Sequence, residues 1–246
     1  MAMRFIIMHK TNPHWESGAR PSQALIERVG AMLGGLATAG ALVGAEGLRA
    51  SAEGVRVTFA AGERTVIRGP FDGRDALPAA FSIVRAASLE DAVEWASRQA
   101  QALSDAEDLE FDIRPVTEPW DIGMGPAPAG VPTRRYMILR KATAATESGV
   151  APSASQRAHL ARLAGERAAP AVHLLSETMR PSRKGRRYKN SPNGISVHDG
   201  PFTETKELIA GYIIVSAASL DDAGRLAQQY LDVVEAEEVE VRELET

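Results

Sequence analysis

The sequence predicts an α+β fold built from two tandem copies of one unit, and three observations support this prediction. Gly69-Pro70-Phe71 recurs 131 residues later as Gly200-Pro201-Phe202, and the same offset relates most of the chain. Strand-like and helix-like stretches alternate in the same order in both copies. A stretch rich in proline and glycine, 117–133, separates the copies and is typical of a linker. We therefore expect a first unit at 1–116, a linker at 117–133 and a second unit at 134–246.

Each copy begins with a strand and a helix. Residues 4–10 and their counterparts 135–141 contain unbroken apolar runs, which predict buried strands. A Pro-Ser pair then marks the start of a helix in both copies, at Ser22 and at Ser153. Ser153 and Gln156 have the spacing of a capping box, which satisfies the free backbone N–H groups of the first helical turn.

Further elements complete each copy. In the first copy they are a strand at 40–48, a hairpin at 55–67, a strand at 81–85, a helix after Ser88 and a strand at 111–114. The resulting order, β-α-β-hairpin-β-α-β, is the split βαβ order of a ferredoxin-like unit. One face of such a sheet is covered by helices, and the other face needs a partner. We expect the second copy to be that partner, in an intramolecular pseudo-dimer.

Composition excludes several classes of protein. The chain has 246 residues, no cysteine and a formal net charge of −4. It therefore has neither a disulfide framework nor a thiolate metal site, which suits a cytoplasmic location. The N-terminal apolar run is too short for a secretory signal. The uncharged stretch 29–45 is too short and too rich in glycine and alanine to span a membrane.

A basic stretch at 180–189 is the one feature that suggests nucleic acid. It contains Arg180, Arg183, Lys184, Arg186, Arg187 and Lys189, with Tyr188 among them. Basic clusters with an interleaved aromatic residue can bind single strands. Because the whole chain is acidic, we favour a solvated hairpin and expect no nucleic-acid partner.

The stretch from Asp199 to Leu208, Asp-Gly-Pro-Phe-Thr-Glu-Thr-Lys-Glu-Leu, resembles the signature of YCII-related proteins in the DGPF-domain branch. The resemblance extends over roughly 4–116 and 135–244, and the first copy is degenerate in the motif. It implies ferredoxin-like units whose sheets pair into a dimeric α+β barrel, here within one chain. Some relatives act on lactone or chlorinated aromatic intermediates, and most have no known activity.

Three residues are candidates for catalysis. His198 and Asp199 pair a group that titrates near neutrality with a carboxylate, as general acid–base chemistry requires. Neighbouring strand residues point to opposite faces, so Asp199 could instead hold a turn. The third candidate is His159, because 157–163 resembles the helical histidine motif that the family resemblance associates with an active-site pair.

Four charged residues are candidates for ligand binding. Lys206 and Glu204 follow the Gly-Pro break, where Lys206 could fix an anionic ligand, although exposed ion pairs of this kind usually mean little. Glu177 and Arg180 end a strand, as Glu46 and Arg49 do in the first copy. Because this pair recurs in both copies, we expect a bridge that holds the strand end.

The histidines at 159, 173 and 198 lack the close spacing of a metal site, so we expect no metal, and nothing in the sequence indicates a cofactor. We predict small-molecule binding in a cleft of the second copy, with acid–base chemistry there. The alternative is a non-catalytic regulatory or scaffolding module, and whether the protein is an enzyme stays open. A further homodimer beyond the internal pseudo-dimer also stays open.

Overall fold

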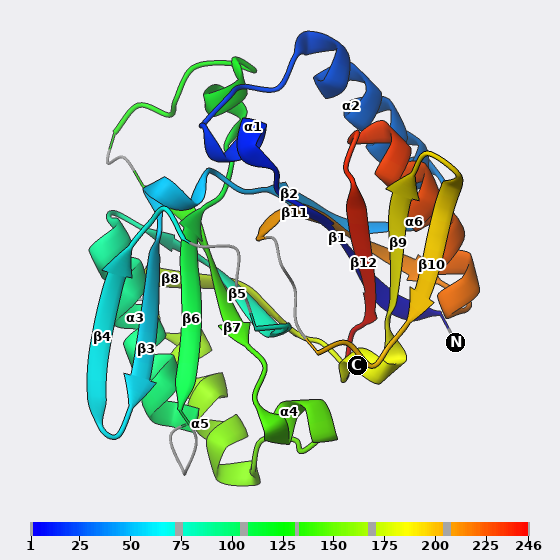
Figure 1. Ribbon diagram of the computed structural model, residues 1–246. Helices are drawn as coiled ribbons and strands as arrows, with labels where there is room; N and C mark the ends of the chain where they lie inside the picture. The colour runs from blue at the N-terminus through cyan, green and yellow to red at the C-terminus, as the bar shows by residue number, and fades with distance from the viewer. Residues whose placement is uncertain are drawn as a thin grey trace. The chain divides into compact units, whose positions relative to one another are not determined.

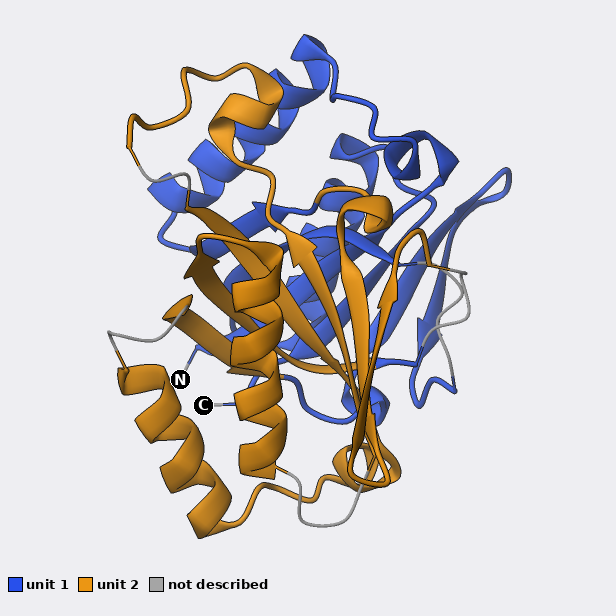
Figure 2. Cartoon of the chain, turned by 90° about the vertical axis from the view of Figure 1, so that its left-hand side faces the viewer, with its two compact units in different colours: residues 1–48, 73–77, 179–246 blue, residues 49–72, 78–178 orange. Residues whose placement is uncertain are grey.

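The structure is a computed structural model that describes residues 2–71, 76–103, 108–130, 133–166, 171–203 and 208–245. The chain divides into two compact units, shown in two colours in Figure 2. Unit 1 takes residues from 1–48, 73–77 and 179–246, and unit 2 takes residues from 49–72 and 78–178. Each unit therefore combines segments of both sequence copies.

Unit 1 contains a six-stranded sheet in the order β10-β9-β12-β1-β11-β2, in which all neighbours are antiparallel (Figure 1). Its strands are β1 (Met3–Lys10), β2 (Leu42–Gly47), β9 (Arg186–Ser191), β10 (Gly194–Asp199), β11 (Ile209–Ala217) and β12 (Glu238–Glu243). Its helices are α1 (Pro13–Glu16), α2 (Gln23–Thr38), the 3₁₀ helix η3 (Ser182–Lys184) and α6 (Leu220–Val233).

Unit 2 contains a second six-stranded antiparallel sheet, in the order β4-β3-β6-β7-β5-β8. Its strands are β3 (Val55–Ala60), β4 (Glu63–Arg68), β5 (Pro78–Ala86), β6 (Leu109–Pro115), β7 (Arg134–Lys141) and β8 (Ala171–Thr178). Its helices are η1 (Ser51–Glu53), α3 (Leu89–Leu103), η2 (Pro119–Ile122), α4 (Ala144–Ser148) and α5 (Ala154–Gly165).

The two copies exchange the segment that comprises their first two strands and the helices between those strands. β1, from the first copy, lies between β12 and β11 of the second copy, and β7 of the second copy lies between β6 and β5 of the first. Residues 1–116 and 134–246 remain the two sequence copies, whereas each sheet takes strands from both. A pattern of apolar residues cannot foresee this exchange, because equivalent strands of two similar copies offer the same pairing surface.

Most of the predicted elements are present. Every strand expected from 4–10 to 111–114 forms, and the hairpin turns at Gly62, which has a φ of 81°. The capping serine of α5 also behaves as predicted, since Gln156 N donates to Ser153 Oγ and Ser153 N donates to Gln156 Oε1. Two short helices, α1 and α4, precede the helices that begin after Ser22 and Ser153, where no helix was predicted.

Part of the predicted linker is held against unit 2. Glu118, which precedes the 3₁₀ helix η2, and Asp121, which lies within it, form a reciprocal cap. Arg135 of β7 donates to both carboxylate oxygens of Glu118, and Arg134 donates to Asp121. Glu118 is buried although it is charged, and a bidentate guanidinium is the partner that makes such burial tolerable. The start of the linker is therefore fixed to β7 by side-chain contacts.

None of the helices in the part of the chain that the structure describes has the length and apolar character of a membrane span.

Candidate functional site

The predicted catalytic pair lies on the exposed edge of the unit 1 sheet. His198 and Asp199 end the edge strand β10, and both side chains are exposed. His198 Nε2 lies 3.3 Å from Ser196 Oγ. Arg186 donates to Asp199 at 2.6 Å and to Asp221 at 2.7 Å. The hydrogen bonds that Arg186 makes with Tyr188, Asp221 and Asp199 raise the pKa of its guanidinium.

The Gly-Pro-Phe turn that follows is shaped by close backbone contact. A Cβ on Gly200 would lie 1.9 Å from the carbonyl oxygen of Ser182, so no other residue fits there. Phe202 N donates to Ser182 Oγ at 3.0 Å, which fixes the turn against η3. Glu204 and Lys206, the proposed ligand-binding residues, lie outside the described residues.

The other candidates divide between the two units. His159 on α5 and Glu177 on β8 belong to unit 2, whereas Arg180 belongs to unit 1 with His198. Arg180 forms its ion pair with Glu243 at 2.9 Å, and its counterpart Arg49 pairs with Glu53 at 2.8 Å. Each arginine thus contacts a neighbouring carboxylate, and the expected bridge from the strand-end glutamates Glu177 and Glu46 stays a prediction.

A buried ion cluster lies beside the Gly-Pro-Phe turn of unit 1. Glu240 is fully buried and contacts Arg187 at 2.9 Å, Arg242 at 3.1 Å and Lys10 at 3.5 Å. Burial alone would raise the pKa of Glu240, but the three cations lower it to about 2. The guanidinium of Arg187 also lies 4.1 Å from the centre of the Phe202 ring.

Unit 2 repeats this cluster at equivalent positions. Asp112 is buried and contacts Lys141 and Arg56, each at 2.7 Å, and these cations lower its pKa against the effect of burial. Arg56 lies 4.8 Å from the centre of the Phe71 ring. Phe71 N donates to Ser51 Oγ, as Phe202 does to Ser182. Since both units retain the cluster, we assign it to the framework that supports the turn.

A pocket between α3, α5 and the β8 edge of the sheet distinguishes unit 2. We call it the α3–α5 pocket; its volume is about 240 Å³. It is lined by Ala80, Phe81, Ser82, Trp95, Gln99, Leu103, Arg140, Pro152, Leu160, Ala161, Leu163, Ala164, His173, Ser176, Glu177 and Thr178. Two contacts tie α5 to α3, one from Gln156 to the carbonyl oxygen of Leu103 and one between Arg98 and Glu166.

A β-bulge places two polar side chains of β8 on one face. Ile83 pairs with Leu175 and Val84 with His173, which leaves Leu174 as the extra residue. An extra residue reverses the alternation of side chains along a strand. His173 and Ser176 consequently point to the same side, with His173 Nε2 2.8 Å from Ser176 Oγ.

These two residues begin a chain of hydrogen bonds that ends on α3. Ser176 Oγ lies 2.8 Å from Ser82 Oγ, which faces it across β5 and β8. Gln99 Nε2 donates to Ser82 Oγ at 3.2 Å. The chain therefore runs from the imidazole of His173 to the amide of Gln99, along one side of the pocket.

Trp95 forms the aromatic wall of the pocket. Its ring stacks on the imidazole of His173, with ring centres 5.8 Å apart and planes inclined by 14°. Trp95 is only 2% exposed, and its Nε1–H has no hydrogen-bond partner among the described residues. Gln99 Oε1 is likewise buried and has no hydrogen-bond partner among the described residues. Each such atom costs about 1–3 kcal/mol of stability.

The same place in unit 1 is filled with apolar side chains. Four positions that are polar or aromatic in the pocket (His173, Ser176, Ser82 and Trp95) are occupied there by Leu42, Ala45, Ile213 and Leu226. All four of the unit 1 residues belong to its hydrophobic core or pack against it. A polar contact is also present there, between His9 Nδ1 and Tyr230 OH at 2.9 Å. Burial lowers the pKa of His9 to about 4 and raises that of Tyr230.

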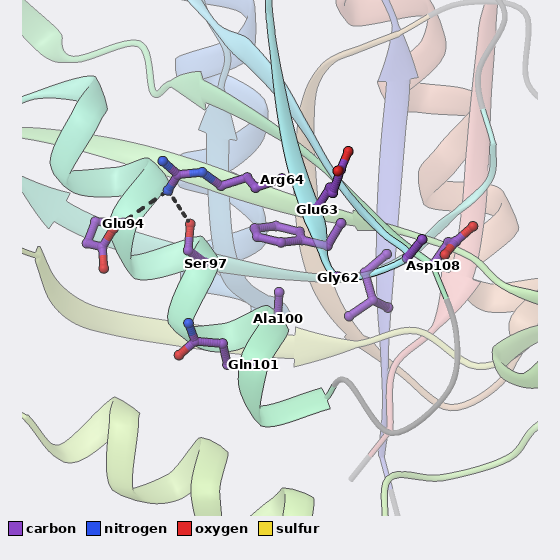
Figure 3. A pocket seen from close by; sticks show the side chains of 11 residues that line it. Gly62, Glu63, Arg64, Glu94, Ser97, Ala100, Gln101 and Asp108 are labelled. Carbon is purple, nitrogen blue, oxygen red and sulfur yellow. Dashed lines mark hydrogen bonds and ion pairs between the residues drawn. The ribbon is translucent and has the colours of Figure 1, made fainter.

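A wider hollow of about 700 Å³ opens on another side of unit 2, between the β3–β4 hairpin and α3. Figure 3 shows Arg64 reaching from the hairpin to Glu94 and Ser97 on α3, at 3.7 and 3.1 Å. Arg64 and Glu94 are each about half exposed, and screening by solvent leaves such a pair worth about 0–1 kcal/mol. We regard this hollow as an open surface and place the candidate site in the α3–α5 pocket.

Sequence reasoning missed most of the pocket. His173 was considered only as a metal ligand, and Ser82, Trp95, Gln99 and Ser176 were not singled out. The available signal was the comparison of the two copies, because each of these positions holds a different residue type in the other copy. Among the described residues, no group of three or more histidine, aspartate or glutamate side chains could hold a metal ion.

Comparison with known proteins identifies both copies. The family model described as the YCII-related domain matches residues 3–117 and again residues 135–245. The two matches leave out the stretch between them, which contains most of the predicted linker. No curated protein and no solved structure matches the chain significantly.

Proposed function

This chain belongs to the YCII-related domain family, and we propose that it binds a small molecule in the α3–α5 pocket. One observation carries the proposal: unit 2 has a cavity of about 240 Å³ lined by Ser82, His173 and Ser176 where unit 1 has an apolar core. The volume of about 240 Å³ suits a molecule below drug size.

The comparison of the two units supports a functional reading of the pocket. Unit 1 builds the same strand order with an apolar core at this place, so the fold does not need polar residues there. The pocket contains residues of both copies, from Ser82 and Trp95 of the first to His173 of the second. We therefore revise the expectation that binding belongs to the second copy alone, and assign it to unit 2.

The test is a ligand screen by thermal shift with a matched pair of variants. Ala164 lines the pocket, and its counterpart in unit 1 is Leu33, which packs against the core. Ala164→Leu should fill the pocket and abolish the shifts that hits cause, whereas Ala158→Leu, on the exposed face of α5, should preserve them. A ligand at 100 times its Kd raises stability by about 2.7 kcal/mol, which such a screen detects.

Hits that shift both variants equally would place binding outside the pocket and contradict the proposal. A broad screen without any hit would favour the alternative, a non-catalytic regulatory or scaffolding module. Acid–base chemistry by His198, Asp199 or His159 stays a prediction. His198 and Asp199 are exposed in unit 1 and His159 lies outside the lining of the α3–α5 pocket, so we place any chemistry of bound ligand at His173 and Ser176.

We also propose finer assignments of fold and family. The strand orders β12-β1-β11-β2 and β6-β7-β5-β8 support a ferredoxin-like topology in each unit. In each order the two inner strands come from different βαβ elements, one strand from each element. Asp199-Gly200-Pro201-Phe202 supports the DGPF branch. Closure of the two sheets into a barrel and a cytoplasmic location stay predictions, as does the absence of a nucleic-acid partner.

A further inference from the structure

A serine and a histidine of β8 form a nucleophile and base pair at the α3–α5 pocket. Ser176 Oγ lies 2.8 Å from His173 Nε2, the separation at which an imidazole can remove the proton of an attacking hydroxyl. Both residues line the pocket. His173 is partly buried, whereas Ser176 is exposed, so an incoming molecule can reach the serine.

The hydrogen bonds behind Ser176 suit a nucleophile. Gln99 Nε2 donates to Ser82 Oγ at 3.2 Å, and Ser82 Oγ lies 2.8 Å from Ser176 Oγ. An amide N–H can only donate, so the hydroxyl hydrogen of Ser82 is free to point to Ser176, whose own hydrogen then points to His173. In this direction the hydrogen bond from Ser82 stabilises the negative charge that Ser176 Oγ gains as it loses its proton.

The imidazole is held in place by its surroundings. Its ring stacks on Trp95 with the planes inclined by 14°, and the bulge in β8 brings His173 to the same side as Ser176. Bulges are common next to active sites because they redirect a side chain. The equivalent strand β2 of unit 1 keeps the bulge but has Leu42 and Ala45 at these two positions. The fold therefore does not require the serine and histidine.

The rest of the pocket suits an ester substrate. β8 is the edge strand of its sheet, so alternate backbone N–H groups along it point away from β5, and such groups can donate to a developing oxyanion. The apolar side chains of Leu160, Leu163 and Ala164 line the same pocket and match an apolar acyl or alcohol part. A cavity of about 150 Å³ already admits benzene, so a small ester fits within the available volume.

Resting on the proposed function, we infer that the α3–α5 pocket is an esterase site for small carboxylic esters, with Ser176 as the nucleophile and His173 as the general base. Ser176 Oγ forms a bond to the ester carbonyl carbon while its proton passes to His173 Nε2. The bond from that carbon to the alcohol oxygen breaks, and the alcohol leaves with the proton. Water then attacks the acyl-serine while His173 accepts a proton from it and returns that proton to Ser176 Oγ, and the carboxylic acid is released.

Hydrolysis of p-nitrophenyl acetate by the full chain tests the inference, because the released nitrophenolate and the acyl-serine are both measurable. The native protein should release nitrophenolate and, after acid quenching, carry an acetyl group on Ser176 that peptide mass spectrometry locates. Ser176→Ala should remove the acetyl group and the release that depends on it. His173→Gln should slow acylation by about a hundredfold or more. A fluorophosphonate should label Ser176 in the native protein and fail to do so after unfolding in urea.

Ser196→Ala is the matched control. Ser196 also lies beside a histidine on an edge strand, with its Oγ 3.3 Å from His198 Nε2, but it is not part of the pocket lining. This variant should leave the rate of hydrolysis unchanged. Ala164→Leu, which fills the pocket, should slow acylation of Ser176 by at least about tenfold.

The outcomes separate the esterase inference from the proposed binding. Screening hits that Ala164→Leu displaces, together with no acyl group on Ser176, would leave the binding proposal standing and overturn the esterase inference. Nitrophenolate release that survives Ser176→Ala at the native rate, or acetylation confined to lysine and other residues, would overturn it as well. Acylation of Ser176 that Ala164→Leu leaves unchanged would contradict both, because the reaction would then not depend on the pocket.

Discussion

The α3–α5 pocket of unit 2 and the α2–α6 core of unit 1 occupy equivalent places in two equivalent sheets. In unit 1, Leu42, Ile213 and Leu226 contribute to a filled apolar core. In unit 2, His173, Ser82 and Trp95 at those positions line a pocket of about 240 Å³. The buried ion clusters around Glu240 and Asp112 are alike in both units, by contrast. Duplication thus separates what the fold requires, which both units keep, from what one unit has added.

The largest effect that we expect concerns the shared ion clusters. Glu240→Gln should lower the free energy of unfolding by about 3–5 kcal/mol, because it leaves Lys10, Arg187 and Arg242 buried without their carboxylate. Asp112→Asn should have a comparable effect in unit 2. Urea denaturation followed by circular dichroism measures both changes.

Glu235→Gln is the control for this comparison. Glu235 pairs with Arg28 at the surface, where its side chain is 66% exposed, so its loss should cost about 0–1 kcal/mol. If the cluster variants were no more destabilised than this control, the clusters could not be the common framework that we describe.

A second prediction compares the core of unit 1 with the pocket of unit 2 directly. Ile213→Ala should cost about 2–5 kcal/mol, because it opens a cavity in a packed core. Ser82→Ala, at the equivalent position, removes a hydroxyl that bridges Ser176 and Gln99 and should cost about 1–2 kcal/mol. Denaturation curves for the two variants give the difference, and equal costs would argue that the pocket is as tightly packed as the core.

The sequence predicts the framework better than the site, for a physical reason. Strands such as 4–10, the turn at Gly62 and the cap at Ser153 depend on neighbours within a few residues, so local patterns reveal them. The pocket depends on Ser82, Trp95, His173 and α5, which only the tertiary fold brings together. Trp95 and His173, read alone, resemble ordinary helix and strand residues.

The exchange of strands between the copies was also hidden, because the two copies offer similar partners to each strand. Dependence on local patterns also explains why the sequence prediction emphasised His198 and Asp199. They belong to a conspicuous local motif, and the structure places them on an exposed edge strand. Position-by-position comparison of the copies would have indicated the pocket instead, because it identifies the polar residues of one copy that align with apolar core residues of the other.

The contact between His9 and Tyr230 in the unit 1 core predicts a pH effect of intermediate size. Burial lowers the pKa of His9 from 6.5 to about 4, so the folded state binds its proton later than the unfolded state does. Above pH 6.5 neither state is protonated there and no stability is lost. As the pH falls from 6.5 to 4, the unfolded state gains the proton first, so His9 should reduce stability by roughly 1–3 kcal/mol.

Comparing the free energy of unfolding at pH 7 and pH 4.5 for the native protein, His9→Phe and His159→Gln measures this effect. His9→Phe should flatten the part of the pH dependence between 6.5 and 4, whereas His159→Gln, which alters a partly exposed histidine on α5, should leave it intact. A pH dependence that survives in His9→Phe would show that another group is responsible.

The smallest effect that we expect is that of cutting the chain between the copies. Residues 123–130 are exposed, so a protease site placed there should be cleaved without disturbing either sheet. β1 is hydrogen-bonded on both sides to strands of the second copy, and β7 to strands of the first, so neither fragment can leave without breaking a sheet. The cut protein should therefore elute as one species on size exclusion, and its fragments should separate only as circular dichroism is lost in urea. If each copy folded by itself, the fragments could part while keeping their strand and helix signals, and that result would refute the exchange.

Cleavage also removes the tether, so a modest fall in stability at low protein concentration is expected, since rejoining becomes bimolecular. The dependence of that fall on concentration would distinguish lost tethering from damage to either unit.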